Sequence, residues 1–318
     1  MITLETVAEA RAACDAARAA GKTVGFVPTM GYFHEGHRSL MRAARAANDF
    51  LVVSLFVNPT QFGPSEDLTK YPRDPEGDSA AAAAEGVDLM FMPSVPEMYP
   101  AGARTTVHVD GLTSTLCGAS RPTHFDGVTT VVTKLFSIVG PCRAYFGRKD
   151  AQQLAVIRRM AIDLDLPVEV VGCPLVREPD GLAMSSRNAY LTSDDREAAL
   201  VLSRALFLAA EAAARGEREA GALRAVVLDT IARCPDVRLD YAEVVDAVNL
   251  EPIDRIESDT LIAVAAFVGQ TRLIDNVAIP YPERKPEPSD RERRIPDRSE
   301  PCPERAGGVA AMSGKQEK

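Results

Sequence analysis

The sequence predicts an α/β protein with a doubly wound, Rossmann-like parallel sheet, followed by a smaller α+β domain. Short apolar runs rich in β-branched residues alternate with helix-patterned segments through the first half of the chain, which is typical of βαβ units. The run over 50–57 is apolar at nearly every position, as expected of a strand covered on both faces. The length of 318 residues corresponds to about two domains at roughly 150 residues each.

The first half of the chain is expected to supply at least five parallel strands. An alanine-rich helix over about 4–20 ends at Gly21, and a buried strand over 24–27 ends at Pro28, which lacks an N–H. The elements expected after these alternate in order: a helix over 37–47, a strand over 50–57, a helix over 74–85, a strand over 87–92, a helix over 128–139, a strand over 143–146, a helix over 150–163 and a strand over 168–172.

The pattern changes after about residue 175. Two long helical patterns, over 194–215 and 217–233, precede three strand-like runs over 239–248, 261–268 and 273–279. We therefore expect a first domain over 1–175 and a smaller domain over 176–282. Residues 283–305 hold five prolines and fourteen charged residues, a composition that cannot offset the entropy of ordering, so 283–318 is expected to be a disordered tail.

The overall charge argues against nucleic acid or a membrane as the main partner. The net charge is −9, and the predicted tail carries nine basic and eight acidic residues, which leaves −10 for the rest. No run approaches the roughly 18 apolar residues that a membrane span requires. The six cysteines form no CxxC pair and the N-terminus lacks a basic-then-apolar leader, so reduced thiols and a cytoplasmic location are expected.

Two of the four histidines, His34 and His37, stand three residues apart in the turn after the first predicted parallel strand. Ligands of open α/β sheets bind at the carboxyl ends of strands, and a helix N-terminus there favours phosphate. Both imidazoles can donate to phosphate oxygens, and Gly36 allows close approach of a nucleotide. A zinc site would need i, i+4 spacing and a third ligand, and a structural histidine pair is the other alternative. His108 is expected to be structural.

The string PTMGYFHEGH at 28–37 carries the HxGH element of the nucleotidylyltransferase superfamily, and it resembles more closely the PTMGxxHEGH motif of the pantoate–β-alanine ligase family. Four further segments are similar to motifs of that family and follow in the family's order: NPTQF at 58–62, RPTHF at 121–125, GRKDAQQ at 147–153 and LAMSSRN at 182–188. The resemblance covers about residues 1–282.

Five positions depart from the family pattern. Tyr32 and Phe33 replace a small aliphatic pair, Arg38 stands at a position that is commonly apolar, and Ala151 replaces a common tyrosine. Thr123 replaces a loop glycine, where a β-branched residue could not adopt a positive φ cheaply.

The resemblance implies a set of site residues. His37, His34, Lys149 and Arg187 are the implied catalytic residues, with His37 as the main donor to the α-phosphate. Pantoate is implied to contact Gln61 and Gln153. The residues implied to contact ATP are Met30, Gly31, His34, Gly36, His37, Gly147, Lys149, Asp150, Val176, Met184, Ser185, Ser186 and Arg187.

The activity implied by the resemblance is the ATP-dependent condensation of (R)-pantoate with β-alanine to pantothenate. Pantoyl adenylate would be the intermediate, AMP and pyrophosphate the by-products, and Mg²⁺ the ion that neutralises the β- and γ-phosphates, with no protein ligand identified for it. The resemblance also implies a homodimer. Because both substrates of the first step are anions, His34, His37, Lys149, Arg187 and two helix N-termini are expected to make the site locally positive.

Two other functions remain open at the level of sequence. A nucleotidylyltransferase acting on a phosphorylated acceptor would share the HxGH element but would not need the two glutamines. A tRNA-binding or regulatory module descended from a synthetase would need a basic face, which the acidic balance disfavours.

Overall fold

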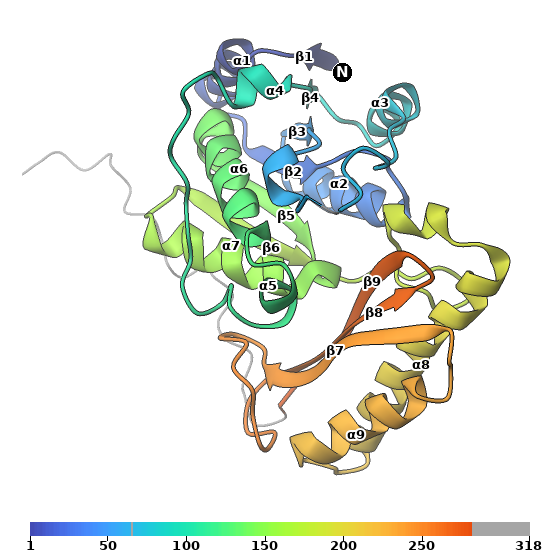
Figure 1. The fold of residues 1–318 in the computed structure, drawn as a ribbon. Helices are drawn as coiled ribbons and strands as arrows, with labels where there is room; N and C mark the ends of the chain where they lie inside the picture. The colour runs from blue at the N-terminus through green and yellow to red at the C-terminus, as the bar shows by residue number, and fades with distance from the viewer. Residues whose placement is uncertain (65, 282–318) are drawn as a thin grey trace, which may run out of the picture. The chain divides into compact units, whose positions relative to one another are not determined.

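The computed structural model describes residues 1–64 and 66–281, which contain a six-stranded parallel sheet and a three-stranded antiparallel sheet (Figure 1). The strand order of the parallel sheet is β1-β4-β3-β2-β5-β6, so the order reverses at β2, between β3 and β5. Its strands are β1 (Ile2–Leu4), β2 (Val24–Thr29), β3 (Phe50–Leu55), β4 (Leu89–Phe91), β5 (Cys142–Gly147) and β6 (Val168–Cys173). This confirms the predicted doubly wound α/β fold.

Helices cover both faces of the parallel sheet. One apolar core packs α1, α6 and α7 against the face that carries Phe26 and Val52, and a second core packs α2 and α3 against the face that carries Val27 and Val53. The helices of the described residues are α1 (Val7–Ala19), α2 (Glu35–Ala47), α3 (Pro75–Ala84), α4 (Val95–Met98), α5 (Leu116–Ser120), α6 (His124–Val139), α7 (Ala151–Asp163), α8 (Ser193–Ala214) and α9 (Ala220–Ile231), with short 3₁₀ turns η1 (Pro59–Gln61), η2 (Arg148–Asp150) and η3 (Ser186–Tyr190).

The antiparallel sheet follows in the chain and is formed by β7 (Val237–Asp246), β8 (Thr260–Val268) and β9 (Thr271–Ile279), in that order. Helices α8 and α9 pack together with its strands around a separate apolar core. Helix α8 begins with a capping box, in which Thr192 Oγ1 accepts from the Asp195 N–H and the Asp195 carboxylate accepts from the Thr192 N–H. The expected smaller α+β part is therefore present.

The prediction that Pro28 ends the first parallel strand was wrong. Strand β2 continues through Pro28 to Thr29, and Pro28 lies opposite Ser54 of β3. The Thr29 carbonyl accepts from the Phe56 N–H on the β3 side, so Pro28, one residue earlier, faces β5. Pairing with β5 ends at Phe26, and the missing N–H of Pro28 therefore removes no ladder hydrogen bond.

Other differences are local. Strand β1 pairs with β4 at the edge of the sheet and was not predicted, because three residues carry too little pattern. Helix α6 begins at His124 rather than 128, and Thr123 before it has a φ of −99°, a conformation open to any residue. The predicted tail over 283–318 lies outside the described residues. No helix within the described part of the chain is long and apolar enough to span a membrane.

Gly127 lets α6 lie directly against η1. A Cβ at Gly127 would come within 2.5 Å of the Thr60 carbonyl oxygen and 2.6 Å of Gln61 Cα. Gly127→Ala should therefore push η1 away and lower the free energy of unfolding by about 1–3 kcal/mol, as measured by denaturant titration. Gly221 in α9 has nothing within 4 Å of its would-be Cβ. The matched variant Gly221→Ala should stabilise by about 0.5–1 kcal/mol, and equal stability of the two variants would contradict this packing.

Candidate active site

A cavity of about 1210 Å³ opens at the carboxyl ends of β2, β3, β5 and β6, where the order of the parallel sheet reverses. The antiparallel sheet closes part of it with side chains from β7, β8 and β9. Gly31 does not line the cavity. The other residues expected from the sequence all do: Met30, His34, Gly36, His37, Gln61, Gly147, Lys149, Asp150, Gln153, Val176, Met184, Ser185, Ser186 and Arg187.

The turn between β2 and α2 is held by a buried carboxylate that the sequence did not reveal. Asp78 of α3 is 3 % exposed, and its two oxygens accept from the N–H groups of Tyr32 at 2.7 Å and Phe33 at 2.6 Å. Gly31 and Tyr32 both have positive φ, 88° and 55°. A left-handed conformation costs a residue with a side chain about 1–2 kcal/mol. The two hydrogen bonds that the Asp78 carboxylate accepts offset this cost.

His34 caps the N-terminus of α2 with its ring. Its Nδ1 accepts from the Gly36 N–H at 3.1 Å, and the His34 N–H points to His37 Nδ1 at 3.4 Å. A ring nitrogen that accepts carries no proton, so each neutral imidazole has its proton on Nε2. A Cβ at Gly36 would lie 2.8 Å from the His34 ring, and Gly36 is therefore needed by the cap itself.

Both imidazoles are neutral near pH 7. Burial, with a smaller contribution from the charge of Lys149, lowers the pKa of His34 to about 4. Burial, together with His34 and Lys149, lowers the pKa of His37 well below its usual range. The rings lie side by side, with centroids 4.2 Å apart. This arrangement offers two uncharged imidazole N–H donors at the N-terminus of α2, where the N–H groups of Gly36, His37 and Arg38 are already bonded to His34.

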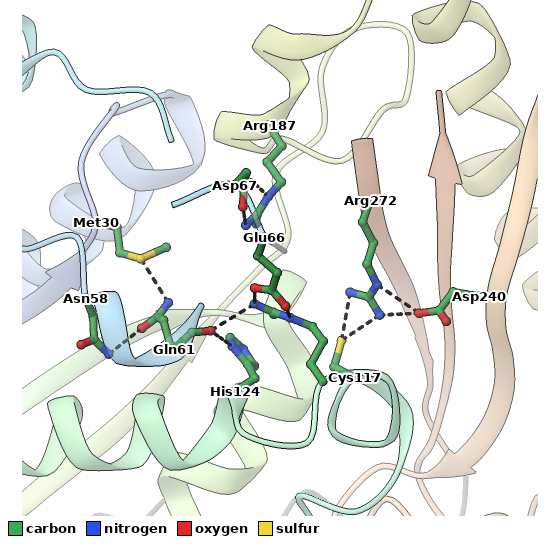
Figure 2. Close-up of polar contacts among 11 residues, drawn as sticks. Met30, Asn58, Gln61, Glu66, Asp67, Cys117, His124, Arg187, Asp240 and Arg272 are labelled. Carbon is green, nitrogen blue, oxygen red and sulfur yellow. Dashed lines mark hydrogen bonds and ion pairs between the residues drawn. The ribbon is translucent and has the colours of Figure 1, made fainter. Parts of the chain in front are cut away.

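The amide of Gln61 is oriented by Asn58, which is 1 % exposed. Asn58 Nδ2 donates to the Gly127 carbonyl at 3.0 Å and to Gln61 Oε1 at 3.1 Å. A carbonyl can only accept, so this contact fixes both amide orientations and leaves Gln61 Nε2 as the group that faces Met30 Sδ, at 3.1 Å (Figure 2). Gln61 therefore presents an N–H₂ donor to the cavity.

Two residues of the RPTHF segment hold the backbone of Gln61. His124 Nδ1 donates to the Gln61 carbonyl at 2.9 Å, and Arg121 Nη2 reaches the same oxygen at 3.3 Å. Burial, with the neighbouring charge of Arg121, lowers the pKa of His124 to about 4, so this ring is also neutral. Figure 2 shows His124 and Gln61 in contact beside the Glu66 carboxylate, which accepts from Arg121.

Lys149 lies at the carboxyl end of β5, where a residue of the antiparallel sheet supports its backbone. Asn276 Nδ2 donates to the carbonyls of Arg148 and Lys149 at 3.0 and 2.8 Å. Lys149 Nζ lies 3.6 Å from Asp150, and its side chain is 20 % exposed.

The segment over 182–188 covers the β2–α2 turn. Ser186 Oγ donates to the Tyr32 carbonyl at 3.4 Å, and Ser185 Oγ caps η3 by accepting from the Arg187 N–H at 3.2 Å. Arg187 does not point freely into the cavity, because its guanidinium donates to Asp67 at 2.9 and 2.8 Å. Its guanidinium carbon also lies 5.8 Å from the centroid of the Tyr71 ring.

The expectation of a locally positive site is not met. His34 and His37 are neutral, and Arg187 is paired with Asp67. Lysine and arginine residues that line the cavity in the described part of the chain are Lys70, Arg121, Lys149, Arg187 and Arg272, and the carboxylates are Glu66, Asp67, Asp150, Asp195, Asp240 and Asp275. Among these described residues the six carboxylates outnumber the five cations, and the donors available to an anion are mainly uncharged N–H groups.

Residues 2–278 match the family model described as pantoate-beta-alanine ligase. The chain is 56 % identical over 279 residues to the pantothenate synthetase of Moorella thermoacetica, which covers 88 % of this chain and 99 % of that protein. It is 53 % identical over 279 residues to the pantothenate synthetase of Acetivibrio thermocellus, with 88 % and 99 % of the two chains covered.

Solved structures of a pantothenate synthetase and a pantoate-beta-alanine ligase also match this chain. A pantothenate synthetase from Thermus thermophilus matches with a TM-score of 0.83 and 49 % identity over 87 % of this chain and 99 % of that chain. The pantoate-beta-alanine ligase from Francisella tularensis, solved in complex with beta-gamma ATP and beta-alanine, matches with a TM-score of 0.72 and 33 % identity over 87 % of this chain and 97 % of that chain. The chain belongs to the pantoate–β-alanine ligase family.

Proposed function

We propose that this protein condenses (R)-pantoate with β-alanine in an ATP-dependent, AMP-forming reaction that yields pantothenate. The observation that carries the proposal is the placement of two kinds of donor in one cavity. The imidazoles of His34 and His37 lie at the N-terminus of α2, and the oriented amide of Gln61 follows the neighbouring strand β3. The family match and the relative solved with an ATP analogue and β-alanine support it.

The first step joins two anions. An oxygen of the pantoate carboxylate attacks the α-phosphorus of ATP, a new P–O bond forms, and the bond to pyrophosphate breaks. No covalent intermediate with the protein is needed, so positioning and charge stabilisation supply the catalysis. His37 and His34 donate from Nε2 to the α-phosphate, Lys149 bridges phosphate oxygens, and Gln61 and Gln153 hold pantoate.

The second step transfers the acyl group. The unprotonated amine of β-alanine attacks the carbonyl carbon of pantoyl adenylate, the C–N bond of the amide forms, the acyl C–O bond to AMP breaks, and the amine releases one proton to solvent as AMP leaves. A free carboxylate is a poor acylating agent because oxide is a poor leaving group, and adenylation replaces it with a phosphate ester.

ATP enters as its magnesium complex in this proposal. The described residues contain no group of three histidine, cysteine or acidic side chains that could hold a metal ion. Mg²⁺ would neutralise the β- and γ-phosphates, held mainly by ATP oxygens and water as is usual for this ion with nucleotides. In this proposal residues 1–175 supply the α-phosphate and pantoate contacts, Val176 contacts the adenine, and Ser185, Ser186 and Arg187 hold the pyrophosphate end of ATP.

The direct assay combines the purified protein with MgATP, pantoate and β-alanine. We expect pantothenate, AMP and pyrophosphate in equal amounts, and no AMP when pantoate is omitted. A nucleotidylyltransferase would instead consume ATP with a phosphorylated acceptor and release pyrophosphate without AMP. That outcome would replace the proposal with the alternative.

His37→Ala should lower pantoate-dependent ATP–pyrophosphate exchange by about 100-fold or more, because a donor aimed at developing charge is lost. Circular dichroism should show an unchanged fold. The matched control is His108→Ala, since His108 is half exposed and pairs with Asp110 and Asp126 outside the cavity lining. Near-normal exchange by His37→Ala would rule out its catalytic role.

A histidine that is held neutral in the folded protein changes how the free energy of unfolding depends on pH. The pKa of His34 is about 4 in the folded protein, against about 6.5 when unfolded, so the unfolded chain binds the extra proton between these values. This contribution to stability is present above pH 6.5 and is lost as the pH falls toward 4. Denaturant unfolding at pH 7 and pH 5 should show a smaller loss for His34→Gln than for the wild type. Equal losses would mean that His34 is not held neutral.

A further inference from the structure

Two arginines that line the cavity are held by consecutive carboxylates of one segment (Figure 2). Arg121 donates to Glu66 at 2.7 and 2.5 Å, and Arg187 donates to Asp67 at 2.9 and 2.8 Å. Each pair is a two-point contact, which is the geometry in which a guanidinium binds either a carboxylate or a phosphate. Glu66 and Asp67 thus occupy the arginines in the way that an anionic ligand would.

The pair of Arg187 and Asp67 is partly shielded from water. The two side chains are 29 % and 23 % exposed, and the Tyr71 ring lies beside the guanidinium. Burial works against the charged form of Asp67, but the hydrogen bonds and the charge of Arg187 hold its pKa below the usual range. The carboxylate is therefore ionised near pH 7, and the ion pair exists when ATP arrives.

Asp67 occupies one of the two edges of the Arg187 guanidinium. Its carboxylate takes Nε and Nη2, so a phosphate that binds this edge at two points must displace Asp67, while a phosphate at the Nη1–Nη2 edge must share Nη2 with it. An ionised carboxylate left beside a bound phosphate would also repel it. Asp67 and a phosphate group therefore compete directly for the Nε–Nη2 edge, and their like charges oppose simultaneous binding at the other edge.

We propose that Asp67 is an internal competitor of ATP. Its carboxylate pairs with Arg187 in the free protein and is displaced from Arg187 by a phosphate group when ATP binds. This inference rests on the proposed function, in which Arg187 binds the pyrophosphate end of ATP. The competition has two consequences. The ion pair keeps the partly buried guanidinium of Arg187 from being unpaired in the free protein. The need to break this pair weakens ATP binding by the free energy of the pair.

Asp67→Asn keeps the size of the side chain and removes its charge. Isothermal titration calorimetry without pantoate should give a Kd for MgATP, and for inorganic pyrophosphate with Mg²⁺, that is lower than in the wild type by about three- to tenfold, because a partly exposed ion pair no longer competes. In an Arg187→Ala background the same substitution should lower both constants by a clearly smaller factor, since no guanidinium remains to be released and only the repulsion between the carboxylate and the phosphates is removed.

Asp240→Asn is the matched control. Asp240 accepts from Arg272 at 3.0 and 2.7 Å and lines the same cavity, but it has no contact with Arg187. We expect its Kd for MgATP to stay within about twofold of the wild type. Thermal unfolding of each unliganded variant shows that it is folded before its affinity is compared.

An unchanged or higher Kd in Asp67→Asn would overturn the competition, as would a tightening of equal size in the Arg187→Ala background. A wild-type protein that forms pantothenate and binds MgATP, but whose Asp67→Asn variant binds no more tightly, would leave the proposed function standing and refute the competition alone. A wild-type protein that binds neither MgATP nor pyrophosphate would refute both.

Discussion

The carboxylate of Asp78 is the contact on which the arrangement of the site depends. It accepts from the consecutive N–H groups of Tyr32 and Phe33, and so holds the two left-handed residues that turn the chain from β2 into α2. The turn brings His34 to the N-cap position of α2, where its Nδ1 accepts from the helix backbone and its Nε2 is left to donate. A carboxylate on one helix thereby sets the chemistry presented by another. Because β2 lies where the strand order reverses, these donors face the crevice in which open α/β sheets bind ligands.

An acidic protein that binds anionic substrates must offset the electrostatic repulsion between them and itself. In this cavity the repulsion is offset without an excess of positive charge. Its imidazoles are neutral, and the arginines beside Glu66 and Asp67 are already paired. Neutral N–H donors at fixed positions stabilise developing charge without a reorganisation cost. In the proposed competition a paired guanidinium becomes available by exchange of one anion for another, so Arg121 and Arg187 are not left unpaired and partly buried in the free protein. Recognition of a polyanion then rests on exchange of partners rather than on a standing positive field.

Sequence reasoning reached the fold class and most of the cavity lining because both follow from local patterns. Alternating apolar runs place the strands, and short motifs at strand ends place residues such as His37, Lys149 and Gln61 at one edge of the sheet. Contacts between residues far apart in the sequence could not be predicted, because no local pattern indicates them. Asp78 resembles any acidic residue in the first turn of a helix, and Asp67 and Glu66 resemble loop charges, although each binds a group far away in the sequence. The prediction that Pro28 ends its strand was wrong, because the effect of a proline depends on which neighbouring strand its missing N–H faces.

His34 and His37 act as neutral donors from Nε2, with each Nδ1 bound to a backbone N–H at the start of α2. The most direct test is ¹⁵N NMR of the protein labelled at its histidine imidazoles, with the two residues assigned by substitution. At pH 7 we expect an unprotonated Nδ1 and a protonated Nε2 for both rings, and no change to the imidazolium form until the pH falls well below 6. Protonated Nδ1 atoms, or imidazolium signals at pH 7, would contradict it.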